Sequence, residues 1–286
     1  MSNKILITGA SGGFGKLMTL TLLEKGHTVV AAMRGPEGKN KAIADELTTA
    51  GAQIVEIDVT SDDSVKQGVE AAGTLDVVIN NAGVGVIGLQ ESFAPEDLQK
   101  LFDINVFGVQ RVNRAVLPAM RERGAGLLIH ISSLLGRMAL PFYGPYNASK
   151  WALEALAENY RVELSGFGVD SCIVEPGGYP TSFMEALMKP SDWARNDTYG
   201  DFAEAPQSLF ENFEQALANN PAQNPQDVAD AVANLIETPA GQRRFRTVVD
   251  KMGMGDHIES YNEQLEQITS GIYNAFGMGD MLKLKV

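Results

Sequence analysis

The sequence predicts an α/β fold, a single domain in which a doubly wound, mainly parallel sheet of seven strands carries helices on both faces. Three observations predict it. Short β-branched runs alternate with longer amphipathic stretches along the chain. The runs are continuously apolar, as strands covered on both faces should be. The length of 286 residues, with 44% hydrophobic and 21% charged residues, suits one large domain.

The expected elements follow one another in strict alternation. We expect strands at residues 4–8, 28–33, 53–59, 75–80, 126–132, 170–175 and 246–249, and helices at 13–25, 38–50, 61–72, 95–123 and 146–165. Gly26 and Gly51 follow the first two helices and suit their C-terminal ends. Asp62 and Asp63 stand in the first turn of the third helix, where negative charge suits the helix dipole.

Composition argues against several classes of partner. The net charge of −13 and the pI near 4.7 disfavour nucleic acid, whose phosphates need a basic face. The one cysteine, Cys172, rules out an internal disulfide, and three scattered histidines give no metal-ligand spacing, so we expect no metal. No apolar run approaches the roughly 20 residues of a membrane span, and the N-terminus does not resemble a signal peptide. We therefore expect no membrane partner and a cytoplasmic location.

A glycine-rich turn joins the first strand to the first helix. Its sequence from Thr8 to Gly15 is Thr-Gly-Ala-Ser-Gly-Gly-Phe-Gly. Glycine tolerates backbone angles that other residues avoid, and it lets the backbone approach a pyrophosphate held at a helix N-terminus. The turn therefore predicts a dinucleotide site.

The end of the second strand indicates which dinucleotide. A carboxylate there would bind the adenosine ribose and repel a 2′-phosphate, whereas a basic residue would accept that phosphate. The strand ends at Met33 without an acid, and Arg34 follows directly. Because a guanidinium group suits phosphate, we expect NADP(H), with NAD(H) as the less favoured cofactor.

The chemistry-bearing residues lie on and before the last expected helix. Tyr146 and Lys150 are four residues apart and share one helical face. The pKa of a tyrosine is normally about 10, and a nearby ammonium group would lower it toward working pH. Ser133 ends the fifth strand, and parallel-sheet sites lie at the carboxyl ends of strands. Its hydroxyl could therefore reach the same place as the Tyr146 phenol.

Taken together, these motifs resemble the short-chain dehydrogenase/reductase family, in its shorter, non-extended branch. The resemblance covers about residues 4 to 250. Its motifs are the turn at 8–15, Asp-Val-Thr at 58–60, Asn-Asn-Ala-Gly at 80–83, Asn105, Ile-Ser-Ser at 131–133, Tyr146-x-x-x-Lys150, and Pro-Gly-x-x-x-Thr at 176–181.

The resemblance implies a role for each catalytic position. Tyr146 would give a proton to the carbonyl oxygen in reduction and take it back in oxidation. Lys150 would hold the nicotinamide ribose and lower the pKa of Tyr146. Ser133, rather than its neighbour Ser132, would hydrogen-bond the substrate oxygen. Asn105 would hold a water that links Lys150 to solvent.

The resemblance also implies cofactor contacts. Asp58 would contact the adenine, with Val59 beside it. Residues 81–83 would line the cofactor and brace the central strands, while Asn80 would serve sheet packing. The full implied set is Gly9, Ser11, Gly12, Gly13, Phe14, Gly15, Arg34, Asp58, Val59, Asn81, Ala82, Gly83, Tyr146, Lys150, Pro176, Gly177 and Thr181.

The stretch at about 178–225 falls where this family places a variable substrate lid. It is rich in aromatic residues and methionine, about half of which we expect to pack the lid on the body, and no lysine or arginine occurs at 140–145 or 175–187. Leu134, Leu135, Met138, Phe142 and Tyr143 add further apolar groups near Ser133. We therefore expect a small-molecule substrate that is an uncharged, fairly apolar ketone, aldehyde or alcohol.

The sequence divides into a Rossmann-type NADP(H)-binding and catalytic domain at residues 1–250 and a C-terminal extension at 251–286. Family members commonly assemble through the helices expected at 95–123 and 146–165, which implies a homodimer or homotetramer. The extension would cover the lid or block one assembly interface. Two other functions stay open: a sugar-nucleotide epimerase or dehydratase of the extended branch, since Gly9, Gly12 and Gly15 also fit its spacing, and a non-catalytic NADP(H)-binding regulator.

Overall fold

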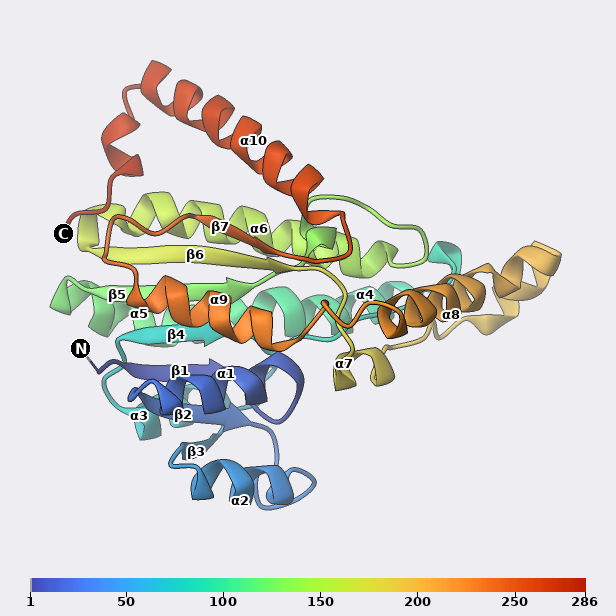
Figure 1. The fold of residues 1–286 in the computed structure, drawn as a ribbon, viewed down its shortest axis with the longest axis horizontal. Coiled ribbons are helices and arrows are strands. Elements are labelled where there is room, and N and C mark those ends of the chain that lie inside the picture. Colours follow the sequence, from blue (N-terminus) through green and yellow to red (C-terminus); the bar gives the residue numbers. More distant parts are fainter. Residues whose placement is uncertain (1) are drawn as a thin grey trace.

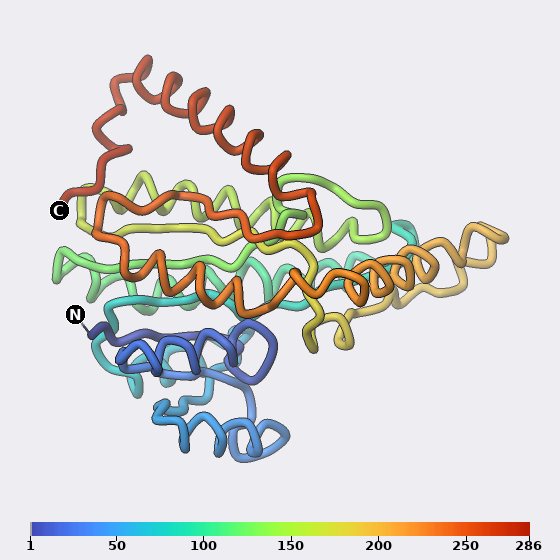
Figure 2. The backbone as a smooth tube through the Cα atoms, in the orientation of Figure 1, coloured from blue at the N-terminus to red at the C-terminus, as the bar shows by residue number. Residues whose placement is uncertain are grey.

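A single parallel sheet forms the centre of the protein, as the sequence predicted. The computed structural model describes residues 2–286. Its seven strands run in the order β3-β2-β1-β4-β5-β6-β7, and every neighbouring pair is parallel (Figures 1 and 2). The strands are β1 (Lys4–Thr8), β2 (Thr28–Met33), β3 (Gln53–Glu56), β4 (Val77–Asn80), β5 (Gly126–Ile131), β6 (Val169–Pro176) and β7 (Arg246–Val249).

Helices cover both faces of this sheet. One face packs on α1 (Gly13–Glu24), α2 (Lys41–Thr49) and α9 (Gln226–Glu237), and the other on α3 (Asp62–Ala72), α5 (Gly108–Arg123) and α6 (Gly144–Leu164). Successive residues of β1 illustrate the division, because Ile5 and Ile7 join the first core and Leu6 joins the second. The remaining helices are α4 (Pro95–Phe102), α7 (Ser182–Glu185), α8 (Ala205–Ala218) and α10 (Gly255–Ala275).

The predicted helical stretch at 95–123 is present over its full range, but it is not one uniform α-helix. Residues Asp103–Phe107 form a π-helical turn between α4 and α5. The turn carries the buried side chain of Asn105, whose amide exchanges hydrogen bonds with the backbone of Val84, 2.9 Å in each direction. A single widened turn of this kind re-aims a side chain inside a helix.

Other predicted boundaries were too long. The strand at 53–59 ends at Glu56, because the carboxylate of Asp58 accepts hydrogen bonds from the amide and hydroxyl of Thr60 and turns the chain. The helix at 38–50 begins only at Lys41, after a turn in which Gly35 has a positive φ of 54°. Beyond residue 165 the structure has four α-helices, α7 to α10, none of which was expected from sequence.

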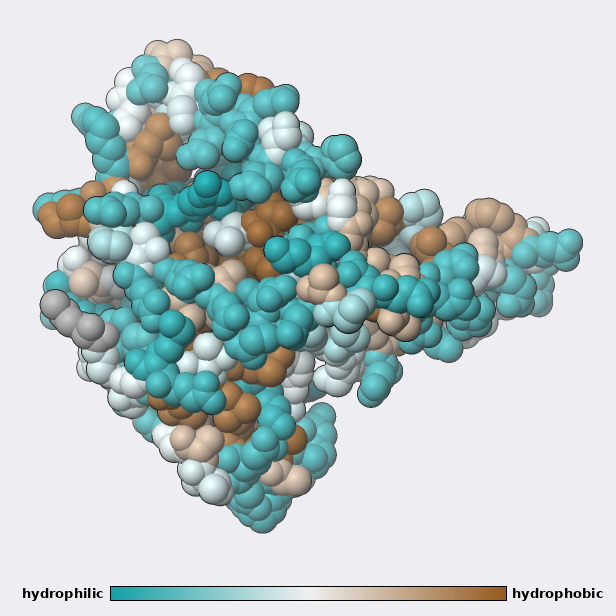
Figure 3. Space-filling model, viewed as in Figure 1, coloured by the Kyte–Doolittle hydropathy of each residue, from teal (hydrophilic) through white to brown (hydrophobic). Residues whose placement is uncertain are grey.

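The C-terminal extension forms an arm outside the sheet. α10 starts beside the end of β7, and the chain returns to the body where the Lys285 amide donates to the Ser165 carbonyl oxygen at 2.9 Å (Figure 1). Ile268, Ile272 and Phe276 on its second half are exposed. The face shown in Figure 3 is mostly hydrophilic, with hydrophobic residues on the inner side of this arm. Within residues 2–286 no helix is long and apolar enough to cross a bilayer.

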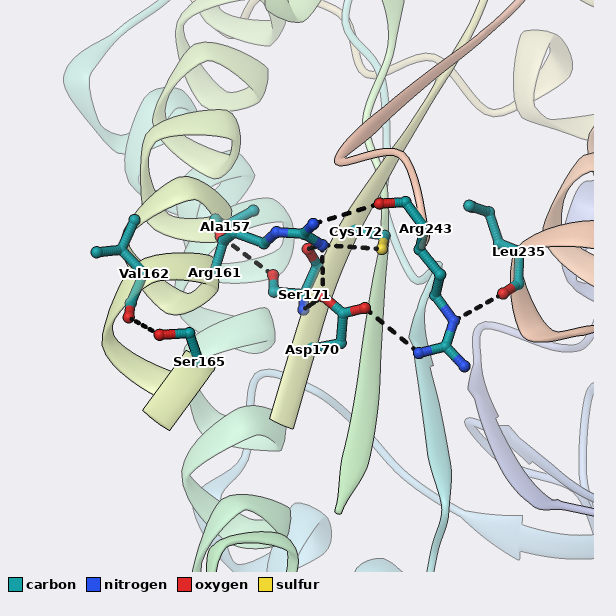
Figure 4. Close-up of polar contacts among 9 residues, drawn as sticks. All are labelled: Ala157, Arg161, Val162, Ser165, Asp170, Ser171, Cys172, Leu235 and Arg243. Carbon is teal, nitrogen blue, oxygen red and sulfur yellow. Dashed lines mark hydrogen bonds and ion pairs between the residues drawn. The ribbon is translucent and has the colours of Figure 1, made fainter. Parts of the chain in front are cut away.

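A buried ion cluster fixes the start of β6. Asp170, 1% exposed, lies between Arg161 of α6 and Arg243, which precedes β7 (Figure 4). The Arg243 guanidinium lies 3.3 Å from the Asp170 carboxylate and also donates to the Leu235 carbonyl oxygen of α9. Cys172, close by, is fully buried, and burial raises the pKa of its thiol to about 12. The cluster therefore ties α6, α9 and β7 to one strand.

We expect Asp170→Ala to destabilise the protein by roughly 3 kcal/mol, because it leaves two largely buried guanidinium groups without their carboxylate. Urea denaturation of the purified protein measures this change. Arg244→Ala is the matched control, since Arg244 is 75% exposed and its pair with Glu259 should contribute less than about 1 kcal/mol. Equal losses in the two variants would contradict the role given to Asp170.

Candidate functional site

The glycine turn packs directly on the end of β4. Gly9 has a φ of +66°, and the Asn81 side-chain amide donates to the carbonyl oxygens of Thr8 at 2.9 Å and Gly9 at 3.1 Å. A Cβ at Gly15 would lie 2.3 Å from the Gly9 oxygen and 2.7 Å from the Asn81 amide nitrogen, so only glycine fits there. The first turn of α1 is thereby held open to the carboxyl edge of the sheet, with backbone amides available for an anion.

A cleft of about 510 Å³ runs along this edge. Most of the residues proposed from sequence line it: Gly9, Ser11, Gly12, Gly13, Phe14, Arg34, Asp58, Val59, Asn81, Ala82, Gly83, Ser133, Tyr146, Lys150, Pro176, Gly177 and Thr181. Gly15 and Asn105 lie behind this wall. The cleft is long enough to join the glycine turn to the tyrosine, and the glycine-lined surface at one end fits a dinucleotide.

Two polar residues beside Arg34 were missed from sequence. The turn at Gly35 brings the chain back, so that Lys39 and Asn40 line the cleft next to Arg34. The Asn40 side chain donates to the Arg34 carbonyl oxygen at 2.6 Å, and the Asn40 amide donates to the Gly35 oxygen at 3.2 Å. Gly35 and Gly38 within five residues were the available signal for such a turn. Two cations therefore stand at the end of β2, where a 2′-phosphate would be recognised.

The proposed catalytic side chains meet at the other end. Tyr146 is 8% exposed, and it lines the cleft together with Ser133, whose side chain is near enough to lower the pKa of the phenol. The Lys150 ammonium group lies 5.6 Å from the centre of the Tyr146 ring and donates to the Ile131 carbonyl oxygen at 2.9 Å. Ser132 points elsewhere: a Cβ at Gly136 would lie 2.7 Å from its hydroxyl oxygen. Ser133 is therefore the serine that reaches Tyr146.

From sequence we expected Lys150 to lower the pKa of Tyr146, but Lys150 is not among the groups that shift this pKa in the structure. Burial raises the pKa of Tyr146 to about 12, and the neighbouring Ser133 side chain offsets this only in part. Lys150 is itself buried, and burial lowers its own pKa to about 8. The reason is geometric, because the ammonium group is bound to the Ile131 carbonyl instead of the phenol oxygen.

The asparagines near the site differ in their roles. Asn105 uses its amide on the Val84 backbone and on the Ser149 hydroxyl, 3.0 Å away. It lies close to Lys150, since a Cβ at Gly83 would be 3.3 Å from the Asn105 oxygen and 3.7 Å from the Lys150 nitrogen. Asn80 does not line the cleft, and its side chain donates to the buried Asn113 of α5 at 2.9 Å.

The tyrosine end of the cleft is almost entirely apolar. Of the groups expected there, Leu134, Leu135 and Tyr143 line the cleft, whereas Met138 and Phe142 do not. Further apolar side chains that were not assigned to the cleft from sequence also line it, among them Val84, Leu140, Leu187, Leu209 and Met254.

The aromatic residues of the lid divide into two groups. Phe183 and Phe213 line the cleft, and the Phe183 ring centre lies 5.9 Å from that of Tyr146. Trp193 and Phe202 lie outside it and are about half exposed.

Two of the contacts between the lid and the body lie close to the cleft and serve as its anchors. Met188 pairs with the backbone at residues 85–87 in a short parallel bridge, with hydrogen bonds of 2.9 and 3.1 Å. The Asp97 carboxylate accepts from the amide and the hydroxyl of Ser191 at 3.0 and 2.7 Å. Only the short segment with α7 stands between these anchors and the end of β6.

Comparison with known proteins gives the family context. A family model described as short chain dehydrogenase matches residues 3–192. A 3-ketodihydrosphingosine reductase from Bacteroides thetaiotaomicron is 37% identical over 201 residues, covering 69% of this chain and 71% of that protein. Retinol dehydrogenase 8 from Bos taurus is 34% identical over 255 residues, covering 85% and 80%. A Burkholderia phymatum short chain dehydrogenase/reductase, solved in complex with NAD, is 25% identical and superimposes with a TM-score of 0.73 over 93% of this chain and 95% of its own.

We expect Lys150→Met to stabilise the protein at neutral pH by about 1–3 kcal/mol while removing its ammonium group from the site. The folded protein holds the Lys150 proton less tightly than the unfolded chain does, with a pKa of about 8 against 10.5. The loss of stability caused by burying the charged Lys150 is therefore fully present below pH 8 and fades as the pH rises toward 10.5. Thermal unfolding of both proteins from pH 6 to 10 measures it, and a variant less stable than wild type at pH 7 would contradict this account.

Proposed function

The chain belongs to the short-chain dehydrogenase family, and we propose that it transfers a hydride between NADP(H) and an uncharged, fairly apolar carbonyl or alcohol substrate. The observation that carries the proposal is that Ser133, Tyr146 and Lys150 together line the apolar end of a cleft whose other end is the glycine turn. A proton donor, a second hydroxyl and a dinucleotide surface share one space.

In the proposed reaction the protein handles the proton and the cofactor supplies the hydride. In reduction, the carbonyl oxygen accepts a hydrogen bond from Ser133 and takes the phenol proton of Tyr146 as the carbonyl carbon gains the hydride. In oxidation the same phenolate takes the proton back. Because Tyr146 is buried and its pKa is raised to about 12, it is protonated at neutral pH among the protein's own groups. This state suits a proton donor.

Cofactor choice rests on the end of β2. Arg34 and Lys39 line the cleft there, and the acidic residue that would repel a 2′-phosphate is missing after Met33. The chain before Gly13 would hold the pyrophosphate against the N-terminus of α1. Asp58 and Val59 would contact the adenine, and Lys150 with Thr181 the nicotinamide half.

The substrate class rests on the lining of the tyrosine end. Val84, Leu135, Phe183, Leu209 and Phe213 offer apolar contacts, and no lysine or arginine other than Lys150 lines that end within the described chain. Its relatives include enzymes named for 3-ketodihydrosphingosine and for retinol, compounds with long hydrocarbon parts, which supports the apolar character of the proposed substrate.

We propose that residues 1–250 work as the catalytic domain with a lid at about 178–225, in a homodimer or homotetramer. The exposed Phe107, between α4 and α5, supports assembly on that face. Because α10 lies outside β7, contact across that edge of the sheet would include the arm.

We expect wild-type protein to consume NADPH with medium-chain aliphatic or cyclic ketones, and Tyr146→Phe to lower kcat by at least about 10²-fold because the proton donor is lost. Absorbance at 340 nm measures turnover, and NADPH fluorescence measures binding, which the variant should keep. Turnover confined to carboxylated or phosphorylated compounds would exclude the substrate class. Undiminished turnover in the variant would exclude the mechanism, and substrate conversion without net change in NADPH would indicate an epimerase or dehydratase.

Arg34→Ala should weaken NADPH binding by about 10- to 100-fold, since it removes a charge-assisted contact to phosphate, and leave NADH binding within about twofold. Titration of both cofactors into the variant measures the two affinities. Lys16→Ala serves as the control, because Lys16 pairs with Glu46 outside the cleft. Equal loss of NADPH and NADH affinity would contradict the assignment of Arg34 to the 2′-phosphate.

A further inference from the structure

A buried cluster of charged side chains lies behind the tyrosine end of the cleft. Arg246 of β7 binds Glu154 of α6 at 3.0 Å and approaches Glu175 of β6 at 3.6 Å. Arg137 lies 3.6 Å from Glu154 and 3.9 Å from Glu175. All four side chains are at most 6% exposed. The position of each of these four side chains therefore depends on the other three and on the residue that covers the cluster.

Each member is joined to a segment that forms the site. Glu154 lies one helical turn after Lys150 on α6. Glu175 directly precedes Pro176 in β6. Arg137 ends the tight turn that begins at Ser133, where the Gly136 amide donates to the Ser133 carbonyl oxygen at 2.8 Å. The cluster thus connects the backbone behind Ser133, Lys150 and the nicotinamide end of the cleft.

The cluster has more carboxylates than cations. Arg246 also binds the partly exposed Glu158 at 3.0 Å, which gives three carboxyl groups for two guanidinium groups. The pKa of Glu175 is raised to about 8, mainly by burial and secondly by the negative charge of Glu154. A further charged side chain would therefore disturb the charge balance of the cluster at neutral pH. A neutral group that both donates and accepts hydrogen bonds fits between the carboxyl and guanidinium groups.

The arm supplies such a group. Asn262 of α10 is 7% exposed, although most of its helix faces solvent. Its amide nitrogen donates to Glu175 at 2.6 Å, and its amide oxygen accepts from the Nε of Arg137 at 3.2 Å. Beside it, Tyr261 stacks under the Arg137 guanidinium, 5.2 Å from ring centre to Cζ. One residue of the arm therefore bridges the two wall segments.

We propose that Asn262 is a positioning residue for the reaction: by joining Arg137 to Glu175 it sets the distance between the Ser133 turn and the end of β6. The inference rests on the proposed function. Ser133 aligns the substrate oxygen, and displacement of an aligned group by about 1 Å can cost on the order of 10²-fold in rate. The arm thus acts on the chemical step without touching substrate or cofactor.

Asn262→Leu should lower kcat for ketone reduction by at least about tenfold and leave the Kd of NADPH within twofold. Gln264→Leu, on the exposed face of the same helix, is the matched control and should keep the wild-type kcat. Thermal unfolding of both variants shows whether they fold. A kcat of Asn262→Leu within twofold of wild type would overturn the inference and leave the proposed function intact. A wild-type protein without NADPH turnover would overturn both.

The pH dependence of kcat in Asn262→Asp distinguishes a positioning role from a purely structural one. The ionisable groups facing residue 262 are Arg137, Glu175, Glu154 and Glu158 of α6, and Arg246, while Glu259 on α10 pairs outward with Arg244. An aspartate still accepts from Arg137, but it bonds Glu175 only while the two carboxyl groups share a proton.

The ratio of wild-type to Asn262→Asp kcat should therefore stay within about twofold at pH 6 and rise to about tenfold or more by pH 9. This variant also carries the test if Asn262→Leu does not fold. A ratio that does not change with pH would overturn the inference.

Discussion

The contact between the glycine turn and the end of β4 sets the position of everything else in the site. The Asn81 amide binds the carbonyl oxygens of Thr8 and Gly9, and the chain passes Gly15 so closely that no side chain fits. This contact fixes where the N-terminus of α1 meets the sheet. Asn81 also begins the segment that leads through Gly83 to Val84, which Asn105 holds. The glycine turn and the segment at residues 81–84 beside Lys150 are thus held together by this one contact.

Burial determines the electrostatics at the tyrosine end. Both Tyr146 and Lys150 are withdrawn from water, so each is pushed toward its neutral form, and the pKa of Lys150 falls as that of Tyr146 rises. The two shifts bring the amine closer to neutral pH and take the phenol farther from it. Any group that adds positive charge beside Tyr146 would reverse the second shift, so the phenol is responsive to what binds next to it.

The sequence was sufficient for the sheet and for most of the cleft. Mostly apolar runs marked all seven strands within a few residues, because strands covered on both faces bury the greater part of their side chains. The site residues could be found because the glycines and Ser133 follow strand ends, and Tyr146 and Lys150 share one helical face, in a known family order. Their proposed chemical roles remain predictions.

The parts that sequence reasoning missed depend on tertiary contacts. The π-turn at Asn105 exists because its amide meets the Val84 backbone, and nothing local marks it. Lys39 reaches the cleft only through the turn at Gly35. Asn262 is one of several asparagines in the chain, and its burial against Glu175 and Arg137 follows from the path of an arm that no local pattern describes.

The two anchors of the lid have a consequence for access to Tyr146. With Met188 hydrogen-bonded to Gly85 and Ser191 held by Asp97, the movable part is reduced to the few residues around α7. Displacing that segment separates Phe183 from the Tyr146 ring but breaks none of the backbone bonds that secure the lid. Such a gate moves at the cost of side-chain contacts alone. Displacement of this segment would uncover the Tyr146 phenol while the lid stays fastened to the body.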